Sequence, residues 1–135
     1  MAVATRTPIR RDNGGMRQAF AHDAVLAMDA DGDPRAPGAA VTVALCGHWE
    51  HEPPCPLAPH HTKAERAGGE VRVRILFATE PERESLVRER ITAALAGGRL
   101  DGPDGVTTRW ELRASFEGEV NPAESEHAGR LVRSS

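Results

Sequence analysis

The chain has 135 residues, a formal net charge of −3 and only 4% aromatic residues. This length fits one domain, whose core is predicted to be aliphatic. The near-balanced charge excludes a general nucleic-acid binder, which carries a basic stripe or patch. No apolar run approaches the roughly 20 residues that span a bilayer, and the N-terminal residues have no apolar signal segment. The sequence therefore predicts a cytoplasmic protein that binds neither nucleic acid nor membranes, with its two cysteines as thiols.

Residues 1–17 are polar and basic and contain the turn pair Asn13-Gly14. Such composition predicts a disordered basic tail, more typical of a solvated segment than of a DNA-binding arm. Residues 18–135 are then predicted to form a single α+β domain. The basic residues of the tail are Arg6, Arg10, Arg11 and Arg17.

Two apolar runs, at residues 24–29 and 40–46, flank a segment rich in Asp, Gly and Pro. This pattern predicts a β-hairpin with a long loop, although a helix over residues 16–28 is an alternative. Residues 47–69 have no periodic pattern and contain four prolines. We expect them to form one long loop, and loops of this length in a domain are usually functional or disordered.

The second half has clearer patterns. Residues 70–78 alternate apolar and polar side chains, which predicts a strand with one solvated face. A helix follows, with Thr79 as N-cap, Glu82 completing a capping box, and Gly97-Gly98 at its end. Its apolar stripe and its i,i+4 ion pair are predicted at Val87, Ile91, Ala94 and Leu95, and at Glu84 and Arg88.

Residues 107–117 alternate again and predict another strand, and residues 122–132 predict a short C-terminal helix. The expected element order is β-β-loop-β-α-β-α. It indicates an α+β sandwich of ferredoxin-like character, with a mostly antiparallel sheet and helices on one face. The apolar face of the 107–117 strand is predicted to carry Trp110, Leu112, Ala114 and Phe116.

Both cysteines and four of the six histidines fall within residues 46–61. Thiolate and imidazole are the ligands that zinc prefers, and four of them make a tetrahedral site. Two thiolates and two neutral imidazoles would balance a dication, so such a site can be partly buried. The segment is therefore predicted to be a metal-binding loop. The six candidate ligands are Cys46, His48, His51, Cys55, His60 and His61.

The spacing C-x4-H-x3-C-x4-H selects Cys46, His51, Cys55 and His60, with His48 and His61 as competing choices. The cysteines rank first, then one of His60 and His61, then one of His51 and His48. A Cys46–Cys55 disulfide is the rival interpretation, which requires an oxidising compartment.

Thiolate and imidazole together suit zinc, with copper as the alternative and nickel or iron still open. The expected role is structural, with the ion shaping an interaction surface for a protein or small molecule that the sequence does not identify. A small metalloenzyme is the alternative, in which Glu50 or Glu52 acts as general base on a metal-bound water. A further alternative is a protein that handles copper or zinc.

Overall fold

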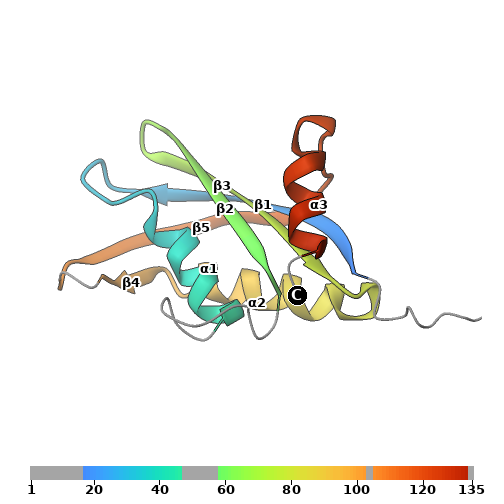
Figure 1. Cartoon of the computed structure of the whole chain (residues 1–135). Helices are drawn as coiled ribbons and strands as arrows, with labels where there is room; N and C mark the ends of the chain where they lie inside the picture. The colour runs from blue at the N-terminus through green and yellow to red at the C-terminus, as the bar shows by residue number, and fades with distance from the viewer. Residues whose placement is uncertain (1–16, 47–57, 103–104, 134–135) are drawn as a thin grey trace, which may run out of the picture.

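Five antiparallel strands form one curved sheet, with helices on both of its faces (Figure 1). The computed structural model describes residues 17–46, 58–102 and 105–133. The strands are β1 (Gln18–Met28), β2 (His60–Ala67), β3 (Glu70–Thr79), β4 (Arg99–Asp101) and β5 (Thr107–Gly118). The helices are α1 (Ala36–Cys46), α2 (Glu84–Ala96) and α3 (Ser125–Arg133), the last two each preceded by a short 3-10 turn. The predicted α+β class is confirmed.

The strands lie in the order β2-β3-β1-β5-β4, with β1 antiparallel to both β3 and β5. Because β2 is antiparallel to β3, β1 and β2 run parallel and are joined through α1. By the same logic β3 and β5 run parallel and are joined through α2. Two strand–helix–strand units are therefore interleaved in one sheet. None of the helices in the described residues has the length and apolar character needed to cross a bilayer.

The core lies between the sheet and the pair α1 and α2, and it is mainly aliphatic as predicted. Trp110 closes one end of it, where its indole N–H donates to the Leu95 carbonyl at 2.8 Å. Gly98 turns the chain there with φ +70°, and a Cβ at that position would lie 2.8 Å from the Trp110 carbonyl oxygen. The largest fully buried side chains of the core include Phe77, Leu26, Leu45, Ile75, Ile91 and Leu95.

The predicted hairpin of residues 24–29 and 40–46 is wrong in its second strand. Residues 36–46 form α1, whose first turn begins beyond Asp33, and the Asp33 carboxylate accepts the Arg35 backbone N–H at 2.9 Å. Val41 and Leu45, one helical turn apart, are buried in the core. The alternative helix over residues 16–28 is also wrong, because that region forms the central strand β1.

The predicted loop 47–69 contains a strand, β2. Its core-facing positions are partly buried but carry Thr62, Ala64 and Arg66, so no apolar alternation marks it in the sequence. The small side chains suit the close approach of α1. A Cβ at Gly38 would lie 2.7 Å from the Thr62 hydroxyl oxygen.

The predicted strand at 70–78, the α2 stripe of Val87, Ile91 and Leu95, and the Glu84–Arg88 ion pair at 2.8 Å are confirmed. The predicted capping box is wrong. Strand β3 continues through Thr79, whose hydroxyl is buried with no hydrogen-bond partner among the described residues. A 3-10 turn then begins after Glu80 and precedes α2.

The predicted apolar face of residues 107–117 is correct only in its first half. The pairing of β5 with β1 shifts register between Val25 and Leu26, so Arg113 is an extra residue in β5. Beyond this bulge Ser115 faces α2, and Phe116 emerges on the opposite face with 49% of its surface exposed.

The prediction that helices cover one face is also wrong, because α3 packs on the face opposite α1 and α2 (Figure 1). It covers one end of the sheet, where Ala21, Leu76 and Ala78 are buried. Leu76 and Ala78 interrupt the polar positions of β3, and this was the sequence signal for a second covered face. We call the side that α3 covers in part the α3 face.

Candidate functional site

The end of α1 and the start of β2 bracket residues 47–57, in which most of the predicted metal ligands lie. Thr42 on α1 and His60 on β2 are in contact, with 3.0 Å between the Thr42 hydroxyl oxygen and His60 Nε2. Cys46 ends α1 four residues after Thr42, and residues four apart share a helix face. Cys46 therefore lies one helical turn beyond the α1 residue that contacts His60.

The hydrogen bonds of His60 define its tautomer. Its Nδ1 lies 3.0 Å from the Ala58 carbonyl oxygen, which can only accept, so Nδ1 carries the proton. Nε2 therefore presents a lone pair toward Thr42. In metal-binding histidines, Nδ1–H usually donates to a backbone carbonyl or carboxylate, and Nε2 binds the metal ion.

His61 lies on the other side of the sheet, because successive strand residues point to opposite faces. Its ring packs against His127 of α3 with 4.4 Å between the ring centroids. Burial lowers the pKa of His61, and the charges of His127 and Lys63 lower it further. His60 and His61 therefore do not converge on one ion in this arrangement.

The remaining predicted ligands, His48, His51 and Cys55, lie outside the described residues, as do Glu50 and Glu52. The Cys46 side chain is likewise outside them. Among the residues that the structure does describe, no group of three or more His, Cys, Asp or Glu side chains is placed to hold a metal ion. Of the predicted N-terminal tail, only Arg17 is described, and its guanidinium lies 3.7 Å from the Glu80 carboxylate.

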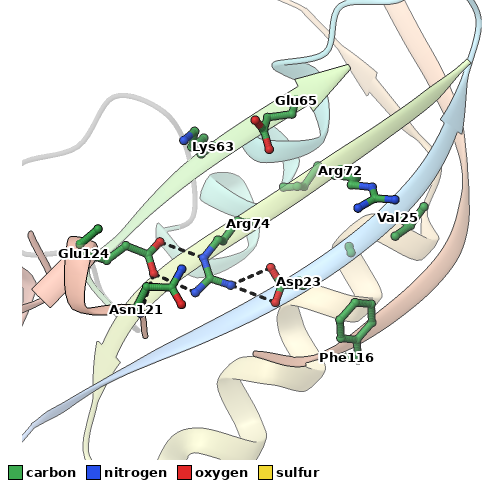
Figure 2. Close-up of a pocket in the computed structure, with 12 residues that line it drawn as sticks. Asp23, Val25, Lys63, Glu65, Arg72, Arg74, Phe116, Asn121 and Glu124 are labelled. Atoms are coloured by element: carbon green, nitrogen blue, oxygen red, sulfur yellow. Dashed lines mark hydrogen bonds and ion pairs between the residues drawn. The ribbon is translucent and has the colours of Figure 1, made fainter. Parts of the chain in front are cut away.

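A hollow of about 530 Å³ lies on the α3 face, between the sheet and the start of α3 (Figure 2). Val25 and Phe116 give it apolar walls, while Lys63 and Glu65 of β2 lie along one side. Three basic and three acidic side chains line it, so its charges balance. They are Lys63, Arg72, Arg74, Asp23, Glu65 and Glu124.

Arg74 is at the centre of these charges and is fully engaged. Its guanidinium donates to Asp23 at 2.9 and 3.0 Å and to Glu124 at 2.8 Å twice, and also to the Glu119 carbonyl (Figure 2). These bonds to Arg74 lower the pKa of Glu124 to about 2 and raise the pKa of Arg74. Glu124 also accepts the Asn121 N–H at 2.9 Å, which caps the turn before α3. The cluster therefore fastens α3 to the sheet, and its cation is not available to a ligand.

A serine–histidine contact lies on the opposite face, with 2.7 Å between His22 Nε2 and the Ser115 hydroxyl oxygen. Arg88 donates to His22 Nδ1 at 3.0 Å, so the ring proton is on Nε2 and points at Ser115. In this state Nε2 cannot take a proton from the serine. The contact is therefore a buried structural network, which continues to Thr92 at 2.7 Å from Ser115, and is not a nucleophile with its base.

This network predicts a pH dependence of stability. Burial first, and the charge of Arg88 second, lower the pKa of His22 in the folded chain. A lowered histidine pKa means that the unfolded chain binds the proton more readily, so the free energy of unfolding decreases as the pH falls below about 6.5. We expect His22→Gln to reduce this decrease, measured by urea denaturation at pH 7.5 and 5.5. His61→Gln is the comparison and should reduce the decrease less, because His61 is exposed whereas His22 is buried. A wild-type stability that rises on acidification would contradict the assignment.

No family model matches the chain, and no curated protein matches it. Among solved structures it is similar in part to the aminobenzoyl-glutamate utilization protein from Klebsiella pneumoniae, at 12% sequence identity and a TM-score of 0.36. The match covers 82% of this chain and 32% of that one, so this chain spans about a third of that protein's length. A similarity at this level gives no evidence about activity.

Proposed function

We propose that this protein is a small zinc-binding α+β protein. Cys46 and His60 supply two ligands, and Cys55 and His51 of the intervening segment supply the others, with His48 as the alternative histidine. The observation that carries the proposal is the 3.0 Å contact between His60 Nε2 and Thr42, one helical turn before Cys46. It supports a site in which donors from α1 and β2 approach the same ion.

The Thr42 contact is compatible with metal binding, because the Thr42 hydroxyl has a second acceptor. It also lies 3.2 Å from the Gly38 carbonyl oxygen, to which it can donate when Nε2 binds the ion. Nδ1–H stays with the Ala58 carbonyl and keeps the ring oriented. The Thr42 hydroxyl and the His60 Nδ1–H therefore both keep a hydrogen-bond acceptor when Nε2 binds the ion.

The position of the site favours a structural ion. Cys46 ends α1 and His60 begins β2, so an ion bound to both would close the connection between them. Metal affinity would then contribute to the stability of this region. The closed segment would form the interaction surface expected from the sequence. Both cysteines are reduced in this site, as in the cytoplasm, and copper is the alternative metal.

We also propose that the fold is ferredoxin-like. The interleaved strand–helix–strand units and the strand order support a ferredoxin-like arrangement, to which β4 and α3 are additions. This arrangement hosts many unrelated functions, so it adds nothing to the choice of activity.

The metal test uses protein expressed without a histidine tag. We expect elemental analysis to find one zinc per chain, and both Cys46→Ser and His60→Gln to lose most of it. His61→Gln is the matched control, because the neighbouring ring lies on the other face of the sheet, and it should retain the metal. Removing zinc with a chelator should lower Tm by about 5 °C, since a ligand that binds only the folded state stabilises it.

Each alternative gives a different result. Metal-free wild-type protein that takes up neither zinc nor copper(I) would overturn the proposal, as would full zinc content in a Cys46→Ser/His60→Gln double variant. Cobalt(II) substitution tests the ligands, because thiolate coordination gives a charge-transfer absorption that Cys46→Ser should weaken. Preference for copper(I) in a direct competition would replace zinc by the alternative metal.

A further inference from the structure

Strand β2 forms one end of the sheet, and its outer side pairs with no other strand among the described residues. The Pro59 carbonyl accepts the Ala78 N–H at 3.0 Å, so residue 59 and every second residue after it direct their backbone groups toward β3. The backbone groups of Thr62, Ala64 and Arg66 therefore point outward. Such an edge is a template for another strand unless the chain prevents it.

Two charged side chains on this edge form no hydrogen bond or ion pair with another described residue, although the charge of Lys63 helps to lower the pKa of Glu124. Lys63 and Glu65 lie on the α3 face of β2, and both are exposed. Figure 2 shows them beside the hollow without an interaction to the other residues drawn. Charges on the adjacent strand are paired, Arg72 with Glu70 at 2.9 Å and Arg74 with Asp23 at 2.9 Å.

We propose that β2 pairs with β2 of a second copy of this chain, antiparallel and centred on Ala64. In this register Ala64 lies opposite its own symmetry mate and Thr62 lies opposite Arg66, so all the outward-pointing backbone groups meet. Lys63 of each copy lies opposite Glu65 of the other. Both belong to the non-hydrogen-bonded positions, where opposing side chains are closest.

The charges select this register against its neighbours. Antiparallel pairing of the outward groups can shift only in steps that keep even-numbered residues opposite each other. Shifting one strand against the other by one such step in one direction places Lys63 opposite Lys63 of the second copy. The same shift in the other direction places Glu65 opposite Glu65. Like charges directly opposite destabilise a pair, whereas opposite charges stabilise it. The edge is therefore protected against indiscriminate pairing and complementary to itself in one alignment.

The length of β2 determines how large the expected dimer interface can be. The opposite sheet end, β4, has only three residues, whereas β2 offers eight. One strand pair without a large apolar surface gives a small interface, so association should be reversible and concentration-dependent. The proposed dimer does not use the zinc site. Self-association should therefore be the same with a chelator present and with zinc present.

The experiment is a charge swap followed by sedimentation equilibrium over a concentration series. Lys63→Glu puts two glutamates opposite each other across the dyad, and Glu65→Lys puts two lysines there. Each should weaken self-association at least about tenfold. The double variant restores opposite charges and should regain dimerisation. Arg90→Glu and Glu89→Lys on the exposed side of α2 are the charge-matched controls.

Mixing the two single variants gives the sharpest result. The Lys63→Glu chain carries two glutamates and the Glu65→Lys chain two lysines, so native mass spectrometry should show the mixed dimer in excess over both homodimers. Hydrogen exchange should become slower with concentration at the amides of Thr62, Ala64 and Arg66. A wild-type chain that stays monomeric at all concentrations, or single variants that dimerise as well as the wild type, would overturn the proposal.

Discussion

Replacing Phe77 by alanine is expected to lower the free energy of unfolding by about 3–5 kcal/mol. The ring is fully buried in β3, and its centroid lies 5.5 Å from that of Phe20 and 5.3 Å from the Arg88 guanidinium carbon. Alanine would therefore remove apolar contacts, an aromatic pair and a cation–π contact together. Because Phe77 lies opposite His60 in the β2–β3 pairing, the variant should also disturb the candidate metal site.

The matched control is Phe116→Ala, since Phe116 is 49% exposed on the α3 face. It should cost less than about 1 kcal/mol. Phe77→Leu keeps most of the apolar volume and should cost less than Phe77→Ala. Urea denaturation with unchanged m-values measures all three variants. Similar costs at Phe77 and Phe116 would show that the core is not centred where the structure places it.

The second half of the chain was predicted well because its elements repeat with clear periods. The alternation of β3 and the i,i+4 stripe of Val87, Ile91 and Leu95 each reflect one buried face. The position of strand β5 was predicted correctly, but the face on which its side chains lie was predicted correctly only for its first half. The extra residue Arg113 reverses the alternation, and a bulge leaves no mark in an otherwise regular pattern.

Helix α1 was predicted as a strand because Val41, Thr42 and Val43 are β-branched residues in a short apolar run. Periodicity cannot separate a buried helix from a buried strand at this length. Burial of Val41 and Leu45 against the core decides the outcome. The local signals for a helix were Pro34 and Asp33, whose carboxylate accepts the Arg35 N–H in the turn before α1.

Strand β2 was missed because an edge strand beneath a closely packed helix needs no large apolar residues. Missing it left His60 and His61 as interchangeable candidates, although strand alternation separates them at once. The Arg74 cluster was out of reach for a different reason. Asp23 and Glu124 lie 51 and 50 residues away in sequence, and only the register of β1 with β3 and the position of α3 bring them to one guanidinium.

Arg74→Ala is expected to lower the free energy of unfolding by about 2–3 kcal/mol, because it leaves two carboxylates without the guanidinium that both of them bind. The side chains of Arg74, Asp23 and Glu124 are only 22–26% exposed, so solvent compensates for the loss only in part. Arg72→Ala, which removes a pair whose arginine is 70% exposed, should cost less than about 1 kcal/mol. Urea denaturation of the two variants compares them, and equal costs would contradict the role of Arg74 in fastening α3.

The same cluster determines how acid destabilises the protein. Arg74 lowers the pKa of Glu124 from 4.5 to about 2 in the folded chain. A lowered carboxyl pKa stabilises the folded state fully above the unfolded value, and this stabilisation is lost as the pH falls from about 4.5 toward 2. Glu124→Gln keeps an acceptor for the Asn121 N–H but cannot titrate, so it should be less stable at pH 6 and lose less on acidification than the wild type. Glu89→Gln on α2 is the control for removing one exposed carboxylate. If Glu124→Gln and the wild type lose stability in parallel between pH 5 and 2.5, acid does not act by releasing α3 from Arg74, and the acid-sensitive contact lies elsewhere in the sheet.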